Sequence, residues 1–536
     1  MAILARPFVE PYARKLAPRT GWCMLLLAVL PVALRLALLA HHPAPSPAVY
    51  DEFGHLLVAD TLLHFRLANP AHPLHQFFET FFVLQTPAYA SIYPLGQGIA
   101  LALGKLLFGY AWAGVLLSSA ALCALCYWML RGWTTPGWAL LGGVLTVIEF
   151  GPTNPWMNGY WGGSLAACAG CLVFGALPRL RTSVGVRDGA LLGLGLAIHW
   201  LTRPYETVFL AMAVLLFFVP EVRASLLRSL AKPALAAAIV LLPAIALSLL
   251  QNRQVTGNWM TLPYTLSRFQ YGVPASFTWQ ANPAPHLELT REQQLQYKMQ
   301  TSFRASGPET IQSYLLRLEY RVRFYRFFFL APLYVALPFF LPSLREWRFA
   351  WVALTLLLFA LGVNFYPFFE VHYLAALTPL FVLVSVTGLQ RLCQWNDAGR
   401  LIIFLCFAHF VFWYARSFAD HPGPERRAAV YQQLAQAPGK QLVFVRYWPQ
   451  HIFQDEWVYN AADIDHARTV WARDLGSTED QKLLHYYPDR TAWLLEPDAM
   501  PPKLSPYRVE EAPKPLPAAP PPTPQNPPPL RFEQVK

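Results

Sequence analysis

Long apolar runs separated by short polar or basic connectors occupy most of the chain. Many of these runs approach the roughly 20 residues that a helix needs to cross a membrane. The first run, 21–40, follows Arg6, Arg14, Lys15 and Arg19 and has no small-residue cleavage site after it. We therefore expect a retained membrane span rather than a signal peptide. The pattern predicts further helices at 92–108, 111–131, 137–151, 163–178, 189–202, 207–220, 233–250, 326–342, 349–366, 371–390 and 401–418.

Basic residues in the connectors predict the side of the membrane that each connector faces, because Lys and Arg collect in cytoplasmic loops. If all the basic connectors after residue 111 are cytoplasmic, every later run alternates sides. Run 92–108 does not fit this alternation, and its glycines favour a re-entrant or surface segment on the outer side. The sequence thus predicts an all-α polytopic membrane protein with about 11 transmembrane helices, its N-terminus cytoplasmic and its C-terminus outside.

The remaining segments define the domain organisation. Residues 419–500 mix helical and strand patterns, which predicts a small α/β domain outside the membrane. Residues 501–536 contain 13 prolines, so we expect an extended or disordered tail. The predicted organisation is a cytoplasmic N-terminus at 1–20, a transmembrane domain at 21–418 with outer loops 41–91 and 251–325, the α/β domain and the tail.

Composition supports a membrane protein. The 536 residues are 55% hydrophobic and only 14% charged, whereas soluble domains carry roughly 25% charge. The net charge of +11 is explained by cytoplasmic loops, and no nucleic-acid-binding motif is present, so we expect no nucleic-acid partner. The seven cysteines lie in or beside apolar runs, which indicates packing residues rather than a disulfide framework.

Asp51 and Glu52 stand in the first outer loop, shortly after the first run. Carboxylates beside a membrane are costly unless they are solvated or paired. One interpretation is a general base that works on a substrate. The other is capping, in which both acids stabilise the start of a helix.

Glu149 ends another run and precedes an aromatic loop that includes Asn158, Tyr160 and Trp161. Aromatic faces can pack on sugar rings while amides bond hydroxyl groups, so the loop is a candidate acceptor or sugar site. An interfacial aromatic belt would have a similar composition.

Arginines on the predicted outer side run against the usual charge bias. Guanidinium groups suit phosphate oxygens, so a lipid-linked phosphate at the outer leaflet would account for them. Ordinary anionic headgroups, or pairing with Glu206 and Glu319, would also account for them. The candidates are Arg203 in one outer turn and Arg317, Arg321, Arg323 and Arg326 at the end of the second long outer loop.

Tyr264 in the second long outer loop and His372 beside Glu370 are further candidates for the acceptor side. Glu370 and His372 could also bind a divalent metal, but two ligands are too few to define such a site. A divalent metal therefore stays an open alternative, with no residue assigned to it.

The first span followed at once by Asp51 and Glu52 resembles the polyprenyl-phosphate-dependent glycosyltransferases of the GT-C fold, such as protein O-mannosyltransferases and aminoarabinose transferases. The stretch 92–96 is similar to a proline-bearing segment of that family near its lipid-phosphate site. The resemblance covers about residues 20–420. It implies that Asp51 is the base or orients the acceptor, with Glu52 beside it, and more loosely that Lys105 lies near the phosphate and Glu149 is a second acid.

We therefore expect a bacterial inner-membrane glycosyltransferase that moves a hexose or pentose from a polyprenyl-phosphate-linked donor to a periplasmic or lipid-borne acceptor. The lipid bilayer and the donor are then its partners. One alternative is a transporter or lipid flippase, which would place ionisable residues near mid-membrane and show inverted repeats. Another is a non-catalytic cell-envelope assembly protein that acts through residues 419–536. Acids gathered at the outer ends of the runs favour the enzyme.

Overall fold

The computed structural model describes all residues except 1–10, 222–223, 276, 304–308, 421–425 and 509–536. The chain forms two compact units. The membrane unit comprises Met1–Ala71 and Thr80–Gly423, and the α/β unit comprises His72–Glu79 and Pro424–Lys536. The α/β unit therefore combines the C-terminal part of the chain with eight residues of the first outer loop.

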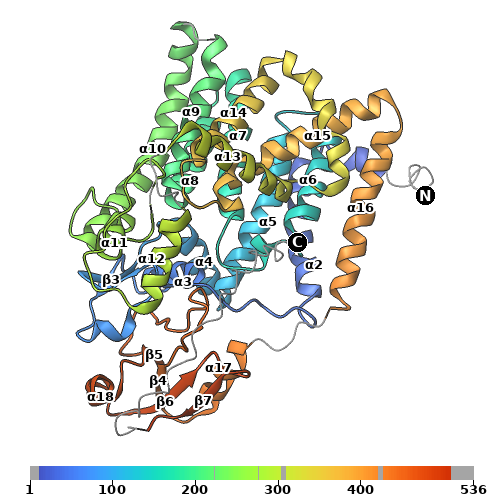
Figure 1. The fold of residues 1–536 in the computed structure, drawn as a ribbon. Helices are drawn as coiled ribbons and strands as arrows, with labels where there is room; N and C mark the ends of the chain where they lie inside the picture. The colour runs from blue at the N-terminus through green and yellow to red at the C-terminus, as the bar shows by residue number, and fades with distance from the viewer. Residues whose placement is uncertain (1–10, 222–223, 276, 304–308, 421–425, 509–536) are drawn as a thin grey trace. The chain divides into compact units, whose positions relative to one another are not determined.

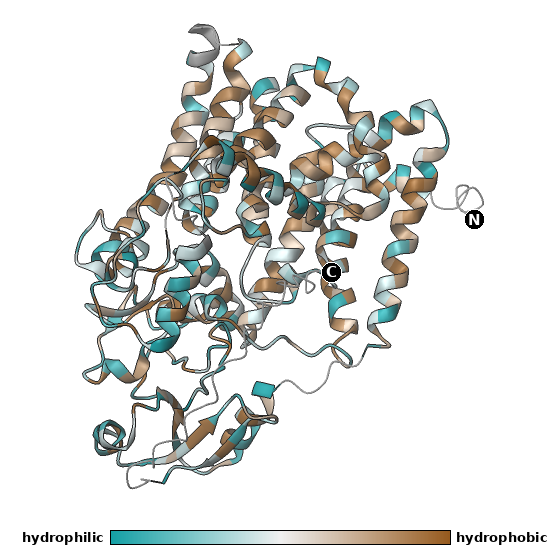
Figure 2. Ribbon diagram, viewed as in Figure 1, coloured by the Kyte–Doolittle hydropathy of each residue, from teal (hydrophilic) through white to brown (hydrophobic). Residues whose placement is uncertain are grey.

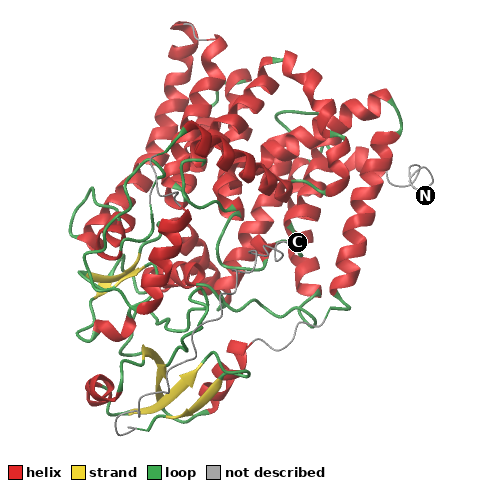
Figure 3. Ribbon diagram, in the orientation of Figure 1, coloured by secondary structure: helices red, strands yellow, loops and turns green. Residues whose placement is uncertain are grey.

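The membrane unit is built almost entirely of helices (Figures 1 and 3). Neighbouring helices pack in the series α10, α8, α7, α5 and α2, while α4 packs against α3, α5 and α8. A three-stranded antiparallel sheet of order β1-β3-β2 lies ahead of α4. The elements are α2 Thr20–Ala37, α3 Tyr50–Leu63, β1 Asn69–Pro70, β2 Val83–Leu84, β3 Ala88–Ser91, α4 Leu95–Phe108, α5 Ala111–Leu130, α6 Pro136–Phe150, α7 Ser164–Thr182, α8 Val186–Thr202, α9 Pro204–Phe218, α10 Ala224–Thr256, α11 Pro263–Tyr271, α12 Arg291–Phe303, α13 Ile311–Val322, α14 Trp347–Val363, α15 Thr378–Trp395 and α16 Ala398–Ser417.

The helices of this unit have the length and polarity of membrane-spanning segments. Within the described residues, 6 helices are long and apolar enough to cross a membrane, and four shorter apolar helices accompany them. Apolar side chains are exposed along α10 and α16, and Figure 2 shows these helices as largely hydrophobic. Contiguous exposed apolar surface is unfavourable in water, so it identifies a membrane protein. The count of about 11 spans remains a prediction.

The run expected to be one helix at 326–342 is instead a series of short 3₁₀ helices. These are η4 Arg323–Phe328, η5 Ala331–Val335 and η6 Leu337–Arg345. Proline has no backbone N–H and clashes with the preceding turn of an α-helix. Pro332, Pro338 and Pro342 therefore prevent a continuous α-helix, and the expectation of one was wrong.

Glycines in α4 permit very close helix packing. A Cβ on Gly98 would lie 2.2 Å from the Val58 side chain, and one on Gly104 would lie 2.1 Å from the Gly114 backbone nitrogen. Small residues are common where membrane helices approach this closely. The glycines that suggested a re-entrant segment are thus explained by the packing of α4 against α3 and α5.

Trp133 and Trp351 fill part of the core of the membrane unit with their polar edges paired. The rings of Trp133 and Trp351 stack with centroids 5.8 Å apart. Their indole N–H groups donate to the backbone oxygens of Phe174 and Ala213, both at 2.8 Å. Buried polar groups need such partners. All seven cysteines are free thiols, and most are buried, as expected for packing residues.

The α/β unit has a four-stranded sheet of order β5-β4-β6-β7. Strand β4 is parallel to β5 and β6, and β7 is antiparallel to β6. The elements are η1 His75–Phe78, α17 Arg426–Gln436, β4 Lys440–Val445, β5 Thr469–Arg473, α18 Ser477–Tyr486, β6 Arg490–Glu496 and β7 Lys503–Pro506. Strand β7 lies inside the expected Pro-rich tail, so the first residues of that segment are part of the sheet. Residues 509–536 lie outside the described part of the chain.

The loop segment 72–79 completes this unit. Phe77 is fully buried, and its ring centroid lies 6.5 Å from that of Phe444 on β4. The His72 Nε2 atom lies 3.3 Å from the Asp465 Oδ1 atom. Arg473 donates to the Glu79 backbone oxygen at 3.4 Å. Residues 419–500 alone therefore lack part of the core of the unit.

Candidate functional site

Asp51 and Glu52 begin helix α3 but have different partners. The Glu52 carboxylate accepts hydrogen bonds from the backbone nitrogens of Ala48 and Tyr160, both at 2.9 Å. It thus stabilises the start of the helix and ties it to a loop that is distant in sequence. The Asp51 carboxylate instead accepts a hydrogen bond from the hydroxyl group of Tyr93. Of the two acids, Asp51 is the one directed toward other side chains of the candidate site.

Tyr93 is positioned by the backbone of α3. A Cβ on residue 54 would lie 2.7 Å from the Tyr93 ring, so Gly54 leaves the space that this ring occupies. The imidazole of buried His55 packs against the Tyr93 ring, and the centroids of the two rings lie 4.4 Å apart. The Tyr93 backbone oxygen accepts from Gln251 Nε2 at 3.0 Å. These contacts hold the hydroxyl group on Asp51.

Arg203 is the cation of the site and lies between α8 and α9. Its guanidinium group lies 5.0 Å from the centre of the Tyr373 ring. Its charge acts on the carboxyl groups of Asp51 and Glu370, whose pKa values it lowers. Across the part of the chain that the structure describes, however, Arg203 forms no ion pair within 4.0 Å. Arg203 is thus near enough to two carboxyl groups to change their pKa values, while its guanidinium N–H groups remain able to bind a ligand.

The protonation of the two acids follows from burial and from their mutual charges. Burial is the main cause that raises the pKa of Asp51 to about 6. The hydrogen bond from Tyr93 and the charge of Arg203 oppose this rise, and the charge of Glu52 adds to it. Burial and then the charge of Asp51 raise the pKa of Glu370 to about 7. Near neutral pH, Asp51 is mostly ionised and Glu370 holds part of a proton. Burial lowers the pKa of His55 to about 3, so that its imidazole stays neutral.

Trp161 and His372 form another side of this site. Their ring centroids lie 5.6 Å apart in an edge-to-face arrangement. The Trp161 side chain lies near enough to lower the pKa of Asp51. Its indole nitrogen is buried and has no partner with hydrogen-bond geometry among the described residues. The indole N–H group lies near the Asp51 carboxylate but outside strict hydrogen-bond geometry, so it can donate to a ligand oxygen bound beside that carboxylate.

The other predicted acceptor residues mainly organise loops. Asn158 accepts from Arg35 Nε at 2.5 Å and donates to the Asn154 backbone oxygen at 2.9 Å. The Tyr160 hydroxyl donates to the Pro45 backbone oxygen at 2.9 Å. The Tyr264 hydroxyl donates to the Ala275 backbone oxygen at 3.0 Å.

Lys105 forms an ion pair, and Glu149 lines a small cavity. The Lys105 ammonium group pairs with Asp60 at 3.0 Å on an exposed part of α4. Glu149, near the end of α6, lines a cavity of about 10 Å³ with Phe328, Leu333 and Ser385 among others. Neither residue has a described contact with the Asp51 carboxylate.

The four arginines at 317–326 fall into two pairs. Arg317 binds Glu309 at 2.7 Å and the Asn364 backbone oxygen at 2.8 Å. Arg321 is buried and donates to several backbone oxygens of 363–368, including that of Tyr366 at 2.6 Å. The exposed residues are Arg323, whose guanidinium lies 5.7 Å from the Tyr320 ring, and Arg326. Arg317 and Arg321 thus stabilise the loop 363–368.

Sequence reasoning did not assign Tyr373 and His55 to the site. It named Glu370 only as a possible partner of His372 in binding a metal or an acceptor, and it covered Tyr93 only as part of the stretch 92–96. Glu370 carries the same signal as Asp51, an acid at the outer end of an apolar run. The aromatic residues carry no such signal, because tyrosines are frequent throughout the outer loops. Within the described residues, no three His, Cys, Asp or Glu side chains come together in a way that could hold a metal ion.

Comparisons with known proteins establish the fold. No protein-family model and no curated protein sequence matches the chain. The structure of ArnT from Cupriavidus metallidurans in the apo state matches with a TM-score of 0.51 and 12% identity, over 89% of this chain and 93% of that chain. The Archaeoglobus fulgidus oligosaccharyltransferase in complex with Zn and sulfate matches with a TM-score of 0.42 and 10% identity, over 88% of this chain and 67% of that chain. The same archaeal protein, AglB, in complex with an inhibitory peptide and a dolichol-phosphate gives 0.37 and 10%, over 89% and 69%.

ArnT, the match with a TM-score above 0.5, is a glycosyltransferase of the GT-C fold. The chain therefore has the GT-C fold, and the resemblance seen in the sequence is confirmed at the level of the fold. At 12% identity the match to ArnT concerns the fold and not the substrate.

Proposed function

We propose that this chain is an integral membrane glycosyltransferase that uses a polyprenyl-phosphate-linked sugar and passes the sugar to a periplasmic or lipid-borne acceptor. We place it in a bacterial inner membrane, with the N-terminus cytoplasmic and the candidate site on the outer side. The observation that carries the proposal is the arrangement of Asp51 and Arg203. A partly buried carboxylate acts on a cation that forms no ion pair with any described residue, and both lie within one site of a GT-C fold.

In the proposed reaction, Asp51 takes the proton of the acceptor hydroxyl group. The acceptor oxygen forms a bond to the anomeric carbon of the sugar, and the bond from that carbon to the phosphate oxygen breaks. The phosphate leaves with the electron pair of that bond. A general base works best when its pKa lies near the working pH, and the Asp51 pKa of about 6 is closer to neutrality than that of an exposed aspartate.

Arg203 binds the departing phosphate in this proposal. Its guanidinium N–H groups can bond two phosphate oxygens at once. Fixed positive charge beside developing negative charge is a major source of transition-state stabilisation. Because phosphate is a good leaving group when its charge is stabilised, the reaction needs no separate general acid.

Trp161 and His372 form the wall beside the sugar. The indole N–H group of Trp161 supplies a donor to a sugar oxygen, and the ring faces supply apolar surface. Glu370 is near Asp51 and Arg203 and holds part of a proton at neutral pH, so it can orient an acceptor hydroxyl group without a full second charge.

The test offers radiolabelled polyprenyl-phosphate sugars to the purified full-length protein in detergent. Release of sugar to water or to added acceptor is measured for wild type and for Asp51→Asn. Asp60→Asn is the matched control, because it makes the same change on the same helix at a residue that pairs with Lys105. Parallel reactions with EDTA and with added Mg²⁺ or Mn²⁺ test whether a metal takes part.

The proposal predicts that wild type and Asp60→Asn release sugar and that Asp51→Asn does not. Release that is equal in all three proteins would remove Asp51 from the mechanism. Failure of every donor with the wild-type protein would contradict the donor class.

A further inference from the structure

The α/β unit contains a second pocket that the proposed reaction does not use. It has a volume of about 330 Å³ and is lined only by residues of this unit. Such a volume lies at the lower end of the roughly 300–1,000 Å³ typical of small-molecule sites. The lining residues come from α17, from the loop 459–468 and from the start of β5, and are Tyr431, Leu434, Ala435, Tyr459, Ala461, Ala467, Arg468, Thr469 and Trp471.

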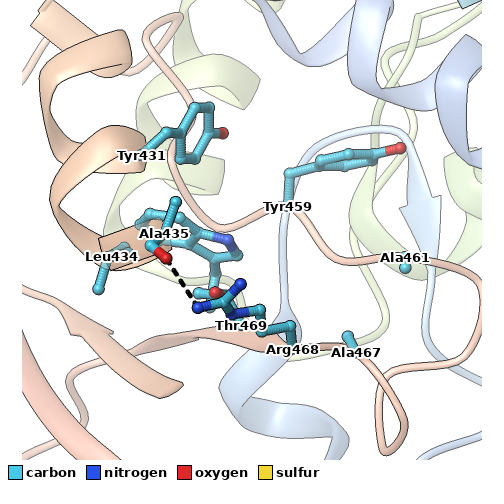
Figure 4. Close-up of a pocket in the computed structure, with 9 residues that line it drawn as sticks. Tyr431, Leu434, Ala435, Tyr459, Ala461, Ala467, Arg468 and Thr469 are labelled. Carbon is cyan, nitrogen blue, oxygen red and sulfur yellow. Dashed lines mark hydrogen bonds between the residues drawn. The ribbon is translucent and has the colours of Figure 1, made fainter. Parts of the chain in front are cut away.

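Three aromatic side chains form one side of the pocket. Figure 4 shows Tyr431 and Tyr459 above the space that Arg468 and Ala467 border from below. Trp471 is buried, and its ring lies edge-to-face with that of Tyr431 at 5.3 Å. This pair is held from within the core, so the aromatic surface is rigid. Alanines at 435, 461 and 467 leave the space open, because no long side chain fills it.

Arg468 provides the polar side. Its Nη2 atom donates to the backbone oxygens of Ala435 at 2.7 Å and Ala437 at 3.0 Å. Those two bonds fix the plane of the guanidinium group at the end of α17. An arginine has five N–H donors. Among the residues that the structure describes, nothing else accepts from this side chain, so Nε and Nη1 can donate to a ligand.

The aromatic wall and the fixed guanidinium group of Arg468 together favour one class of ligand. Flat aromatic faces beside a small number of fixed donors suit a sugar ring, which has an apolar face and a rim of oxygens. A purely apolar ligand would leave the remaining Arg468 donors without acceptors, and this is unfavourable if the ligand removes water from them. The Thr469 side chain adds a hydroxyl group to the lining.

We propose that this pocket binds one sugar unit of a glycan, with its ring against the tyrosines and its oxygens on Arg468. This role rests on the proposed function, because a glycosyltransferase with a sugar acceptor would hold the acceptor at a point separate from the reacting hydroxyl group. The binding itself can be measured without turnover.

The experiment applies the labelled full-length protein in detergent to a glycan array and then titrates the glycan that is retained most strongly. Ala435→Leu fills the pocket from an exposed position on α17, and we expect it to weaken binding at least tenfold. Ala429→Leu makes the same change at an exposed position of the same helix that does not line the pocket, and it should leave binding within twofold. Arg468→Gln should weaken binding at least fivefold. Thermal melting of each variant verifies that the α/β unit is folded.

Asp51→Asn separates this inference from the proposed function. It should bind the glycan as wild type does, even if it transfers no sugar. Retention of no glycan would overturn the inference, as would binding that Ala435→Leu does not weaken. Displacement of the glycan by a peptide of residues 509–536 would also overturn it, because the pocket would then belong to the chain's own proline-rich segment.

Discussion

The site around Asp51, with Arg203, and the arginine-rich segment 317–326 were both candidate phosphate-binding regions in the sequence. They differ in whether their charged groups already have partners in the structure. Around Asp51, the carboxylates of Asp51 and Glu370 and the cation Arg203 act on one another without forming an ion pair within the described residues. In the second region, Arg317 is paired with Glu309, and Arg321 is surrounded by backbone oxygens.

This difference separates arginines that complete the fold from an arginine that remains able to bind a ligand. A buried guanidinium group needs several acceptors, and Arg321 finds them in the loop 363–368. Arg203 has an aromatic ring beside it and acids nearby, but its guanidinium donors have no acceptor among the described residues. The number of arginines in a segment therefore says less about ligand binding than the acceptors that each one already has.

The largest effect should come from Asp51→Asn, which we expect to lower sugar transfer at least 10³-fold, near the upper part of the range for loss of a general base. The fold should persist. Because burial raises the pKa of Asp51 to about 6, the ionised carboxylate costs folding free energy above that pH. The neutral amide should therefore keep or raise Tm, which thermal melting in detergent measures beside the turnover assay. A large drop in Tm would show that Asp51 supports the fold instead.

Arg203→Gln compared with Arg323→Gln tests the contrast between the two regions. Removing the cation beside the leaving phosphate should lower kcat/KM about 10²-fold, as for other electrostatic groups of active sites. Arg323 is exposed, so its loss should change kcat/KM less than about threefold. Equal losses in the two variants would contradict the assignment of phosphate binding to Arg203.

Arg321→Met should reduce stability rather than chemistry. The substitution leaves the backbone oxygens of 363–368 without their donors, which costs about 2–4 kcal/mol. We expect a lower Tm and less folded protein, measured by thermal melting and size-exclusion chromatography. The activity of each folded molecule should fall less than tenfold. Loss of activity at an unchanged Tm would instead place Arg321 in the site.

Tyr93→Phe should have a smaller and more specific effect. The hydroxyl group of Tyr93 stabilises the ionised form of Asp51, so its removal raises the pKa of Asp51. We expect the acidic limb of the pH–activity profile to move to higher pH and kcat to fall about tenfold. An unchanged limb would mean that the hydroxyl group does not act on the titrating residue.

Features that depend on a single segment of the chain could be predicted from local sequence patterns. The apolar runs predicted most helices, and the position of Asp51 and Arg203 at the outer ends of runs singled out both residues. Pro332, Pro338 and Pro342 also carried enough information to predict a broken helix, but the hydrophobicity of the run outweighed them in our interpretation.

Contacts between distant segments could not be predicted in this way. Glu52 binds the backbone of Tyr160, 108 residues away, and so differs from Asp51 beside it. Arg321 binds a loop more than 40 residues further along the chain. Phe77 is buried in the α/β unit although it belongs to the first outer loop. A truncation at residue 419 would therefore expose Phe77 and would not be a clean test of the C-terminal residues.

The most direct test of the central claim is the pH dependence of sugar release from a polyprenyl-phosphate donor by wild type and Asp51→Asn. If Asp51 is the base, the wild-type rate should rise about tenfold per pH unit below pH about 6 and then level off, as its pKa requires. The Asp51→Asn protein should show only a low rate without this limb. A wild-type-like rate and limb in Asp51→Asn would contradict the account.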